Sequence, residues 1–236
     1  PKGDTRGPAP RVIEPWATMD YGPSLINTYE VGRDGKNFAY KGIATRLDPG
    51  PGGVSRGQRW MIFDHDTMRM AAAWTGTGFI DWQGIHFDGR HGAHPHLLGD
   101  VVLQNPTGPG WADPQTGSFD DNQRVIGRDE RRYGPLPRAW AHYRGLYHFE
   151  DRTIVSYSVG STDVLEMPSS PTQLSATNSS GTTASLTPVF ERQFQLGPRA
   201  TPLKLLVATH AREAAQQLPA DSSAPQIVRF GIEPTK

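Results

Sequence analysis

Short segments in which apolar and polar residues alternate recur along most of the chain. Alternation with a period of two residues is typical of β-strands that bury one face. The stretches between these segments are rich in Gly, Pro, Asp and Asn, which favour turns. The pattern predicts strands over residues 24–31, 38–47, 58–63, 67–74, 79–87, 101–104, 140–149, 152–159, 163–167, 189–196, 203–209 and 226–232.

The clearest part of the pattern is a run of three strands in the second half of the chain. Strands over 140–149, 152–159 and 163–167 are separated only by short turns at 150–151 and 160–162. Strands joined by such short turns form an antiparallel meander.

Only one segment has the composition of a helix, and it is short: residues 210–218 (HAREAAQQL). Many strands with one short helix predict an all-β fold, and we expect an antiparallel β-sandwich. A β-barrel of cupin-like type is the alternative. Residues 89–108 are similar to part of the first cupin motif, but their spacing departs from it and no second motif follows.

The length of 236 residues suits a single large β domain. Residues 1–15 carry four prolines and predict an extended arm, so we expect one domain over 16–236. Residues 168–188 are rich in Ser, Thr and Pro and predict a flexible excursion. Residues 105–137 predict a long loop, which inside a compact domain is usually functional or mobile.

Composition and charge exclude several functions. Lys and Arg together number 24, as do Asp and Glu, and no basic block stands out, so we expect no nucleic-acid partner. No apolar run approaches the roughly 20 residues that a membrane span needs. The chain has no cysteine, which excludes disulfides, thiolate nucleophiles and covalent haem within it.

Four of the eight histidines lie within residues 86–96. In an extended strand, His94 and His96 would point to the same side. With His91 and Asp88 they form a candidate site for a transition metal with an open position. The alternative is that these histidines bond backbone carbonyls of a surface loop or contact a substrate.

Two further charged clusters predict surface structure. Asp64-His65-Asp66 reads as a hairpin turn, in which Asp side chains bond nearby backbone amides. The alternative is an oriented imidazole or a calcium site. Residues 128–132 (RDERR) mix both charge signs and predict a solvated surface.

Aromatic residues suggest a second kind of site, because flat rings stack on sugars while neighbouring polar groups bond hydroxyls. The predicted sugar-binding residues are Trp74, Asp81, Trp82, Arg90 and Trp111. Core packing is the alternative for the tryptophans, and it is what we expect for Trp60 and Trp140. The motifs GxSxG, GxGxxG and HExxH are absent from the sequence. Paired carboxylates for glycoside cleavage depend on a spatial distance, which the sequence leaves open.

Several spaced segments over residues 20–210 resemble one known family. They include YGPSLINTYEV, KGIATRL, GIHFDGRHGAHP, GPGWADPQTGSF, YGPLPRAWAHYRGLYHFEDRTIVSYSVGSTDVLEMP and FERQFQLGP. The family is the N-terminal β-rich domain of large secreted proteins of planctomycetes and related bacteria, which also carry a propeller-like region and a c-type cytochrome with CxxCH. The resemblance implies a periplasmic, extracellular or cell-surface location and a link to oxidative chemistry, but supplies no catalytic residues.

Together these features favour an exported accessory module. We expect it to bind carbohydrate or to contact the cytochrome c or propeller domain of the same or a partner chain. The rival hypothesis is a metal-dependent enzyme that acts on sugars, oxidatively or hydrolytically, through His91, His94 and His96. Non-covalent haem contact through the same histidines is a third hypothesis.

Overall fold

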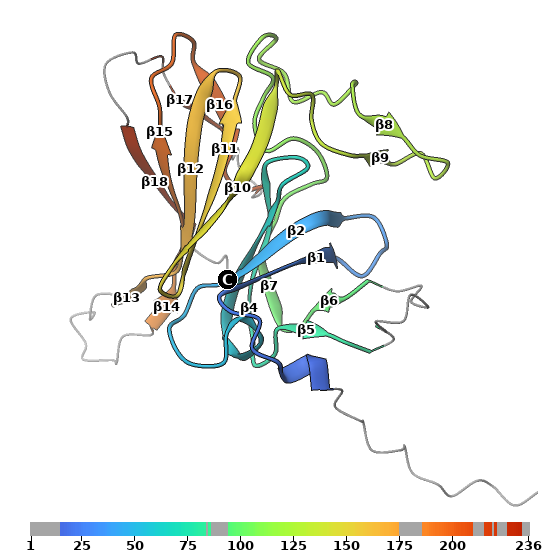
Figure 1. Ribbon diagram of the computed structural model, residues 1–236, viewed down its shortest axis with the longest axis vertical. Coiled ribbons are helices and arrows are strands. Elements are labelled where there is room, and N and C mark those ends of the chain that lie inside the picture. Colours follow the sequence, from blue (N-terminus) through green and yellow to red (C-terminus); the bar gives the residue numbers. More distant parts are fainter. Residues whose placement is uncertain are drawn as a thin grey trace, which may run out of the picture.

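The computed structural model describes residues 15–83, 85, 94–174, 186–209, 215–218, 220 and 226–232. Over these residues the chain is nearly all β (Figure 1), which confirms the predicted fold class. The helical elements in the described part are two short 3-10 turns, η1 (Pro15–Thr18) and η2 (Val54–Arg56). The arm predicted over 1–15 lies outside the described residues except for Pro15, which begins η1.

A seven-stranded sheet contains the N-terminal half of the fold, in the order β5-β6-β1-β2-β3-β4-β7. Neighbouring strands are antiparallel except for β1 and β6, which are parallel. The strands are β1 (Ser24–Glu30), β2 (Phe38–Arg46), β3 (Arg59–Asp64), β4 (Arg69–Thr75), β5 (Ile80–Asp81), β6 (His96–Leu97) and β7 (Asp100–Gln104).

A second, five-stranded antiparallel sheet has the order β10-β11-β12-β15-β18. Its first three strands are the predicted meander. The strands are β10 (Ala141–Phe149), β11 (Arg152–Val159), β12 (Thr162–Ser169), β15 (Phe190–Leu196) and β18 (Gln226–Ile232).

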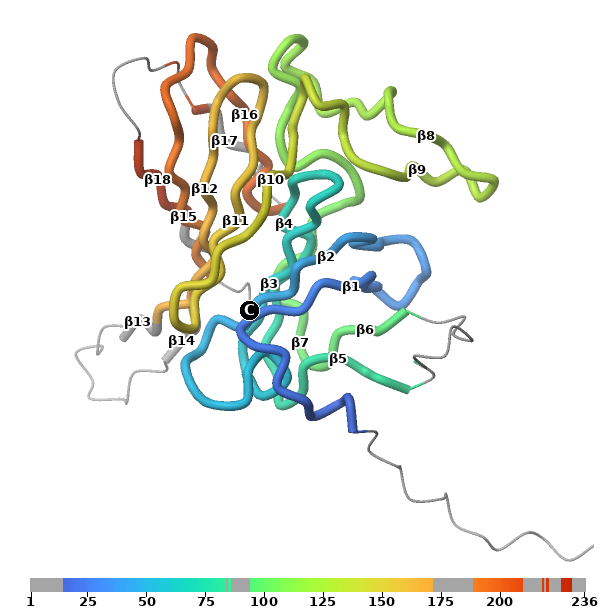
Figure 2. Tube along the Cα trace, in the orientation of Figure 1, coloured from blue at the N-terminus to red at the C-terminus, as the bar shows by residue number. Residues whose placement is uncertain are grey.

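Three two-stranded ribbons complete the described fold. Their strands are β8 (Val125–Ile126) with β9 (Arg132–Tyr133), β13 (Thr172–Leu174) with β14 (Leu186–Pro188), and β16 (Leu203–Leu206) with β17 (Ala215–Leu218). Figure 2 shows the β8–β9 ribbon projecting away from both sheets, on the side of the β1–β2 turn.

Two hydrophobic cores hold the fold together, and strand β3 contributes to both. Met61 and Phe63 pack in the core between the sheets, against residues such as Tyr157 of the second sheet. Trp60 and Ile62 point the other way, into a core enclosed by the seven-stranded sheet itself. Successive side chains of a strand face opposite sides, so a strand covered on both faces joins two cores.

The core between the sheets also contains a fully buried ion pair. Arg192 Nε lies 2.6 Å from Glu166 Oε1, and both side chains are 0% exposed. The Tyr157 hydroxyl donates to the other carboxylate oxygen at 2.8 Å. Arg192 Nη1 also donates to the carbonyls of Leu206 and Val207, so the pair ties β12 and β15 to the β16 segment.

Two expectations from the sequence need correction. The helix predicted over 210–218 is wrong where the structure describes it, because Ala215–Leu218 is β17 and pairs with β16. The segment contains good helix formers, but intrinsic propensity is weak enough for pairing with a neighbouring strand to override it. The excursion predicted over 168–188 begins and ends in strands, with residues 175–185 outside the described part.

Candidate functional site

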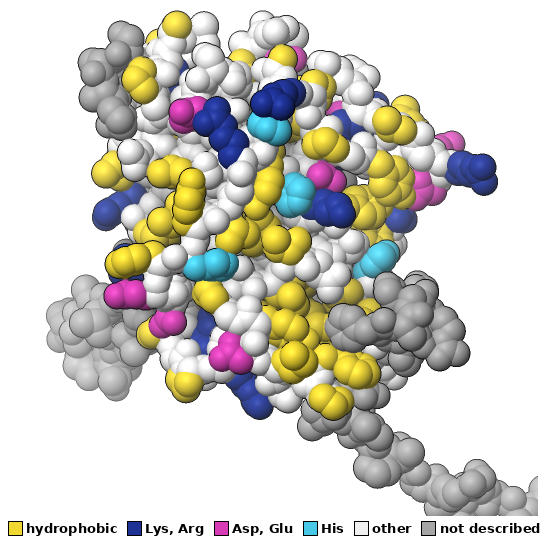
Figure 3. All heavy atoms as spheres, in the orientation of Figure 1, with side chains coloured by type: hydrophobic (Ala, Val, Ile, Leu, Met, Phe, Trp, Pro, Cys, Tyr) yellow, Lys and Arg dark blue, Asp and Glu magenta, His cyan; other side chains and the backbone are white. Residues whose placement is uncertain are grey.

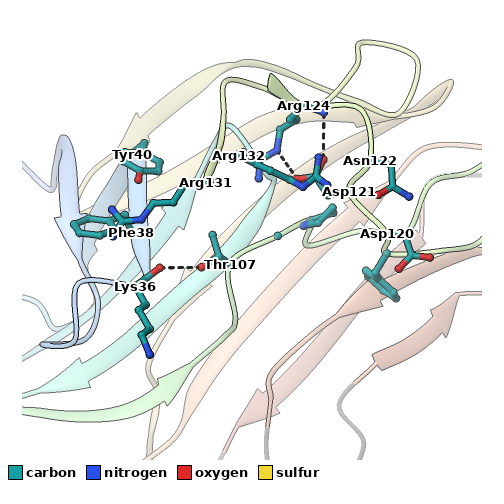
Figure 4. Close-up of a pocket in the computed structure, with 13 residues that line it drawn as sticks. Lys36, Phe38, Tyr40, Thr107, Asp120, Asp121, Asn122, Arg124, Arg131 and Arg132 are labelled. Carbon is teal, nitrogen blue, oxygen red and sulfur yellow. Dashed lines mark hydrogen bonds and ion pairs between the residues drawn. The ribbon is translucent and has the colours of Figure 1, made fainter. Parts of the chain in front are cut away.

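A pocket of about 390 Å³ lies where the β1–β2 turn, the long loop after β7 and the β8–β9 ribbon meet (Figure 4). The sequence predicts a functional or mobile loop over 105–137, and the part of it before β8, residues 105–124, supplies more than half of the lining. The lining residues are Lys36, Phe38, Tyr40, Thr107, Gly108, Pro109, Phe119, Asp120, Asp121, Asn122, Arg124, Arg131 and Arg132.

Aromatic rings form one wall of this pocket. Phe38 and Tyr40 stand two residues apart on β2, so they share a face of the strand, and their rings stack at 5.5 Å. Tyr40 in turn contacts Tyr133 of β9 at 4.9 Å between ring centroids. Phe119, from the long loop, is half-buried and has no ring partner within the described residues, which leaves it available for a ligand.

Hydrogen bonds fix the ionisation states beside this wall. The Tyr133 hydroxyl donates to Asp129 at 2.6 Å, and the Tyr40 hydroxyl lies 3.4 Å from that of Tyr133. The bond to the Asp129 carboxylate, and then the one with Tyr40, raises the pKa of Tyr133 well above its ordinary value. The same bond from Tyr133 lowers the pKa of Asp129. Tyr133 is therefore a neutral donor and Asp129 an anion at pH 7.

Two arginines of the pocket are held in place by their own contacts. The Arg131 guanidinium lies 4.9 Å above the Phe38 ring, donates to the Gly35 carbonyl, and has Nε 3.6 Å from Asp129. Arg124 Nε donates to Asp121 at 2.7 Å, and this pair is almost completely buried. These contacts give the pocket rigid walls before any ligand arrives.

The structure changes the interpretation of two predicted sugar-binding residues. Trp74 and Trp111 are wholly buried, so the expectation that they are exposed is wrong. Trp74 stacks on Trp60 at 5.4 Å inside the seven-stranded sheet. Trp111 donates from Nε1 to the Tyr157 hydroxyl at 3.1 Å, in the core between the sheets. Trp60 and Trp140 are buried, as predicted.

The other predicted sugar-binding residues lie elsewhere. Trp82 is half-buried and stacks on Tyr21 at 6.1 Å, and Asp81 accepts a hydrogen bond from the Gln83 amide. Neither lines the pocket. Arg90 lies outside the described residues.

The predicted metal ligands are only partly described. His94 is exposed and lies edge-on to the Phe38 ring at 5.5 Å, next to the pocket. His96 Nδ1 lies 3.5 Å from Glu30 Oε2. Within the described residues, no three His, Asp or Glu side chains gather closely enough to hold a metal. Asp88 and His91 lie outside that part, so the metal site stays a prediction.

Asp64, His65 and Asp66 form the β3–β4 turn, as the turn interpretation predicts. Asp64 accepts the Asp66 amide at 3.2 Å and the Thr67 hydroxyl at 2.9 Å. His65 stacks on Tyr143 at 4.4 Å. Burial, followed by the nearby Asp64 carboxylate, raises the pKa of Asp66. Asp64 thus holds the turn, while His65 packs against β10.

Sequence reasoning missed most of the pocket. The run 128–132 was predicted to be a solvated surface, yet Arg131 and Arg132 line the pocket. The signal in the sequence was the spacing of Phe38 and Tyr40, which puts two rings on one face of a strand. This spacing could not show that the β8–β9 ribbon lies beside the two rings.

Comparison with known proteins gives one family match. Residues 61–166 match the model of a family described as Domain of unknown function (DUF6797). The matched segment begins within β3 and ends within β12, so it includes strands of both sheets. No curated protein and no solved structure matches the chain.

The surface and helix content bear on partners. Positive and negative side chains are interspersed on the face shown in Figure 3, in line with the zero net charge of the sequence. In the part of the chain that the structure describes, no helix has the length and apolar character of a membrane-spanning segment.

Proposed function

We propose that the chain is a carbohydrate-binding module of a larger exported protein, and that a saccharide binds in the pocket between β2, the long loop and the β8–β9 ribbon. The observation that carries the proposal is the combination of aromatic rings and solvent-facing polar groups around one preformed space of about 390 Å³. This volume is in the range of small-molecule sites.

The lining supplies the two kinds of contact that sugars need. A half-exposed ring such as Phe119 offers a flat apolar face to the C–H groups of a sugar. Asp120 and Asn122, both exposed on the same loop, offer acceptors and donors to hydroxyl groups. Rigid neighbours such as the Arg124–Asp121 pair lower the cost of ordering the site on binding.

The carboxylates favour binding over hydrolysis. Glycoside cleavage commonly uses two carboxyl groups, one as acid and one as base or nucleophile. Asp121 is tied to Arg124 at 2.7 Å. Asp120 is then the only lining carboxylate without a cationic partner among the described residues. A single carboxylate of this kind does not supply the pair.

The exported location and the neighbouring redox domains enter this proposal from the family resemblance. In that setting the module would hold a saccharide close to the propeller-like and cytochrome domains. It would therefore act by raising the local concentration of a substrate that another domain oxidises.

A glycan array with three variants tests the proposal. Phe119→Ala removes the available ring and should weaken binding by roughly tenfold. Phe149→Ala is the matched control, because Phe149 is 62% exposed on β10 and does not line the pocket. Trp82→Ala tests the other aromatic surface. Absence of any bound glycan would refute the function, and loss of binding in Trp82→Ala alone would refute the pocket.

A further inference from the structure

We infer that the saccharide bound in this pocket is anionic, that Arg132 contacts its acid group, and that Lys36 adds positive charge to the same lining. The inference rests on the proposed function and narrows it to sugars that carry a carboxylate or a sulfate. It comes from the arrangement of charges around the pocket (Figure 4).

Four cations and two acids line the pocket, and some of these charges are already paired. Arg124 and Asp121 form a nearly buried ion pair at 2.7 Å, so neither is free for a ligand. Arg131 is shared between the Phe38 ring and Asp129. The remaining charges are those of Lys36, Arg132 and Asp120.

Arg132 is the residue that points most directly to an anion. It begins β9 and is half-buried, and its side chain forms no hydrogen bond or ion pair with any described residue. A guanidinium has five N–H donors and no acceptor. Because Arg132 lines the pocket, an acceptor on a bound ligand would satisfy donors that its own side chain leaves unpaired within the described residues.

Lys36, in the β1–β2 turn, is a second cation of the lining. Its ammonium group is exposed and has no ion-pair partner among the described residues, while its backbone carbonyl accepts from the Thr107 hydroxyl. The one remaining acid, Asp120, accepts the Ser118 hydroxyl at 2.7 Å. Two available cations thus outnumber the one remaining acid among the lining residues, so the lining has an excess of positive charge.

A neutral sugar would leave this excess uncompensated. A carboxylate or sulfate would accept from the Arg132 fork in the bidentate geometry that guanidinium groups favour. The ring that carries this anion could still stack on Phe119 in the same pocket. Carboxylated and sulfated sugars share this chemistry, and the probes below separate them.

The test measures binding of matched acidic and neutral oligosaccharides by isothermal titration calorimetry. The first pair is a galacturonic acid hexamer and its methyl ester. The second is a sulfated galactan oligosaccharide and its desulfated form. We expect at least one acidic probe to bind more tightly than its neutral partner, and its binding to weaken as salt is raised, because the contacts are partly exposed.

Variants then assign the contact. Arg132→Gln should weaken binding of the acidic probe by roughly tenfold, since it removes a charge-assisted hydrogen bond. Arg132→Lys keeps the charge but not the fork, so it should fall between wild type and Arg132→Gln. Arg138→Gln is the matched control, because Arg138 is exposed and does not line the pocket. Lys36→Gln is a second variant at an exposed lining position, and melting temperatures check that all variants fold.

The outcomes separate this inference from the function on which it rests. Preference for an acidic probe that disappears in Arg132→Gln and persists in Arg138→Gln supports it. Equal binding of acidic and neutral probes, or full retention of acidic binding in both Arg132→Gln and Lys36→Gln, overturns it. If Phe119-dependent binding of neutral glycans persists in that case, the proposed function survives. If no glycan binds, both the inference of an anionic saccharide and the proposed function are refuted.

Discussion

Substitution of Glu166 by glutamine removes the carboxylate that offsets the buried charge of Arg192. Both side chains are 0% exposed, and the N–O distance is 2.6 Å. Breaking a buried pair by removing one partner costs about 3–5 kcal/mol, because the remaining charge is left in a low-dielectric interior. Arg192 keeps two backbone carbonyl acceptors, and glutamine can still accept from Tyr157, so we expect the lower end.

The predicted loss is therefore about 3 kcal/mol. It is a large fraction of the roughly 5–15 kcal/mol by which such domains are stable. Equilibrium unfolding in urea at pH 7 measures it, with Glu150→Gln as a matched control at an exposed position. The double variant Glu166→Met/Arg192→Leu should lose less unfolding free energy than the single variants Glu166→Met and Arg192→Leu lose together, because no unpaired charge remains in it.

Two results would refute this reasoning. One is a loss below about 1 kcal/mol in Glu166→Gln, which is the value of an ordinary neutral hydrogen bond. The other is simple additivity in the double variant, which would mean that the two charges do not depend on each other.

Three further predictions concern the turn, the loop and the inner core. The pKa of Asp66 is raised in the folded protein, so the folded state binds the proton of this carboxyl more tightly than the unfolded chain does. The stability that the protonated Asp66 contributes is therefore lost as the pH rises through the folded-state pKa. Asp66→Asn should then be more stable than wild type at pH 7, and thermal melts should show this advantage shrinking as pH falls toward the ordinary carboxyl pKa. Gly110→Ala should cost at least about 2 kcal/mol in urea unfolding, because its Cβ would lie 2.1 Å from the Met68 carbonyl oxygen; a stable variant would contradict this close approach. Trp74→Ala should cost about 3–5 kcal/mol by cavity formation, and glycan affinity measured below its melting temperature should not change; a selective loss of affinity would place this residue in the site after all.

Most of the strands could be predicted from the sequence because each depends on local alternation. The meander of β10, β11 and β12 follows directly from three alternating segments and their short turns. The segment at 215–218 failed because its composition favours a helix, while its pairing partner β16 lies several residues away. Local patterns cannot weigh a partner that only the tertiary fold supplies.

The pocket could be predicted only in part for the same reason. The length of the loop over 105–137 predicts a functional or mobile segment, and residues of this loop line the pocket. Arg131 and Phe38 are far apart in sequence, and they meet through the position of the β8–β9 ribbon, which no local pattern encodes. For Trp111 the local pattern was misleading in another way. The preceding Gly-Pro-Gly segment is typical of an exposed loop, but it packs close to β4, and the Trp111 ring is buried.

Strand β3 contributes to both hydrophobic cores, and this affects how the protein unfolds. Because β3 sends alternate side chains into both cores, neither core can come apart while the other stays intact. The amide protons of β3 and its neighbours β2 and β4 should then exchange with solvent only through global unfolding, as one cooperative foldon. A fragment limited to residues 61–166 would cut through β3 at its start and separate β12 from β15, so it should not exchange as a protected unit.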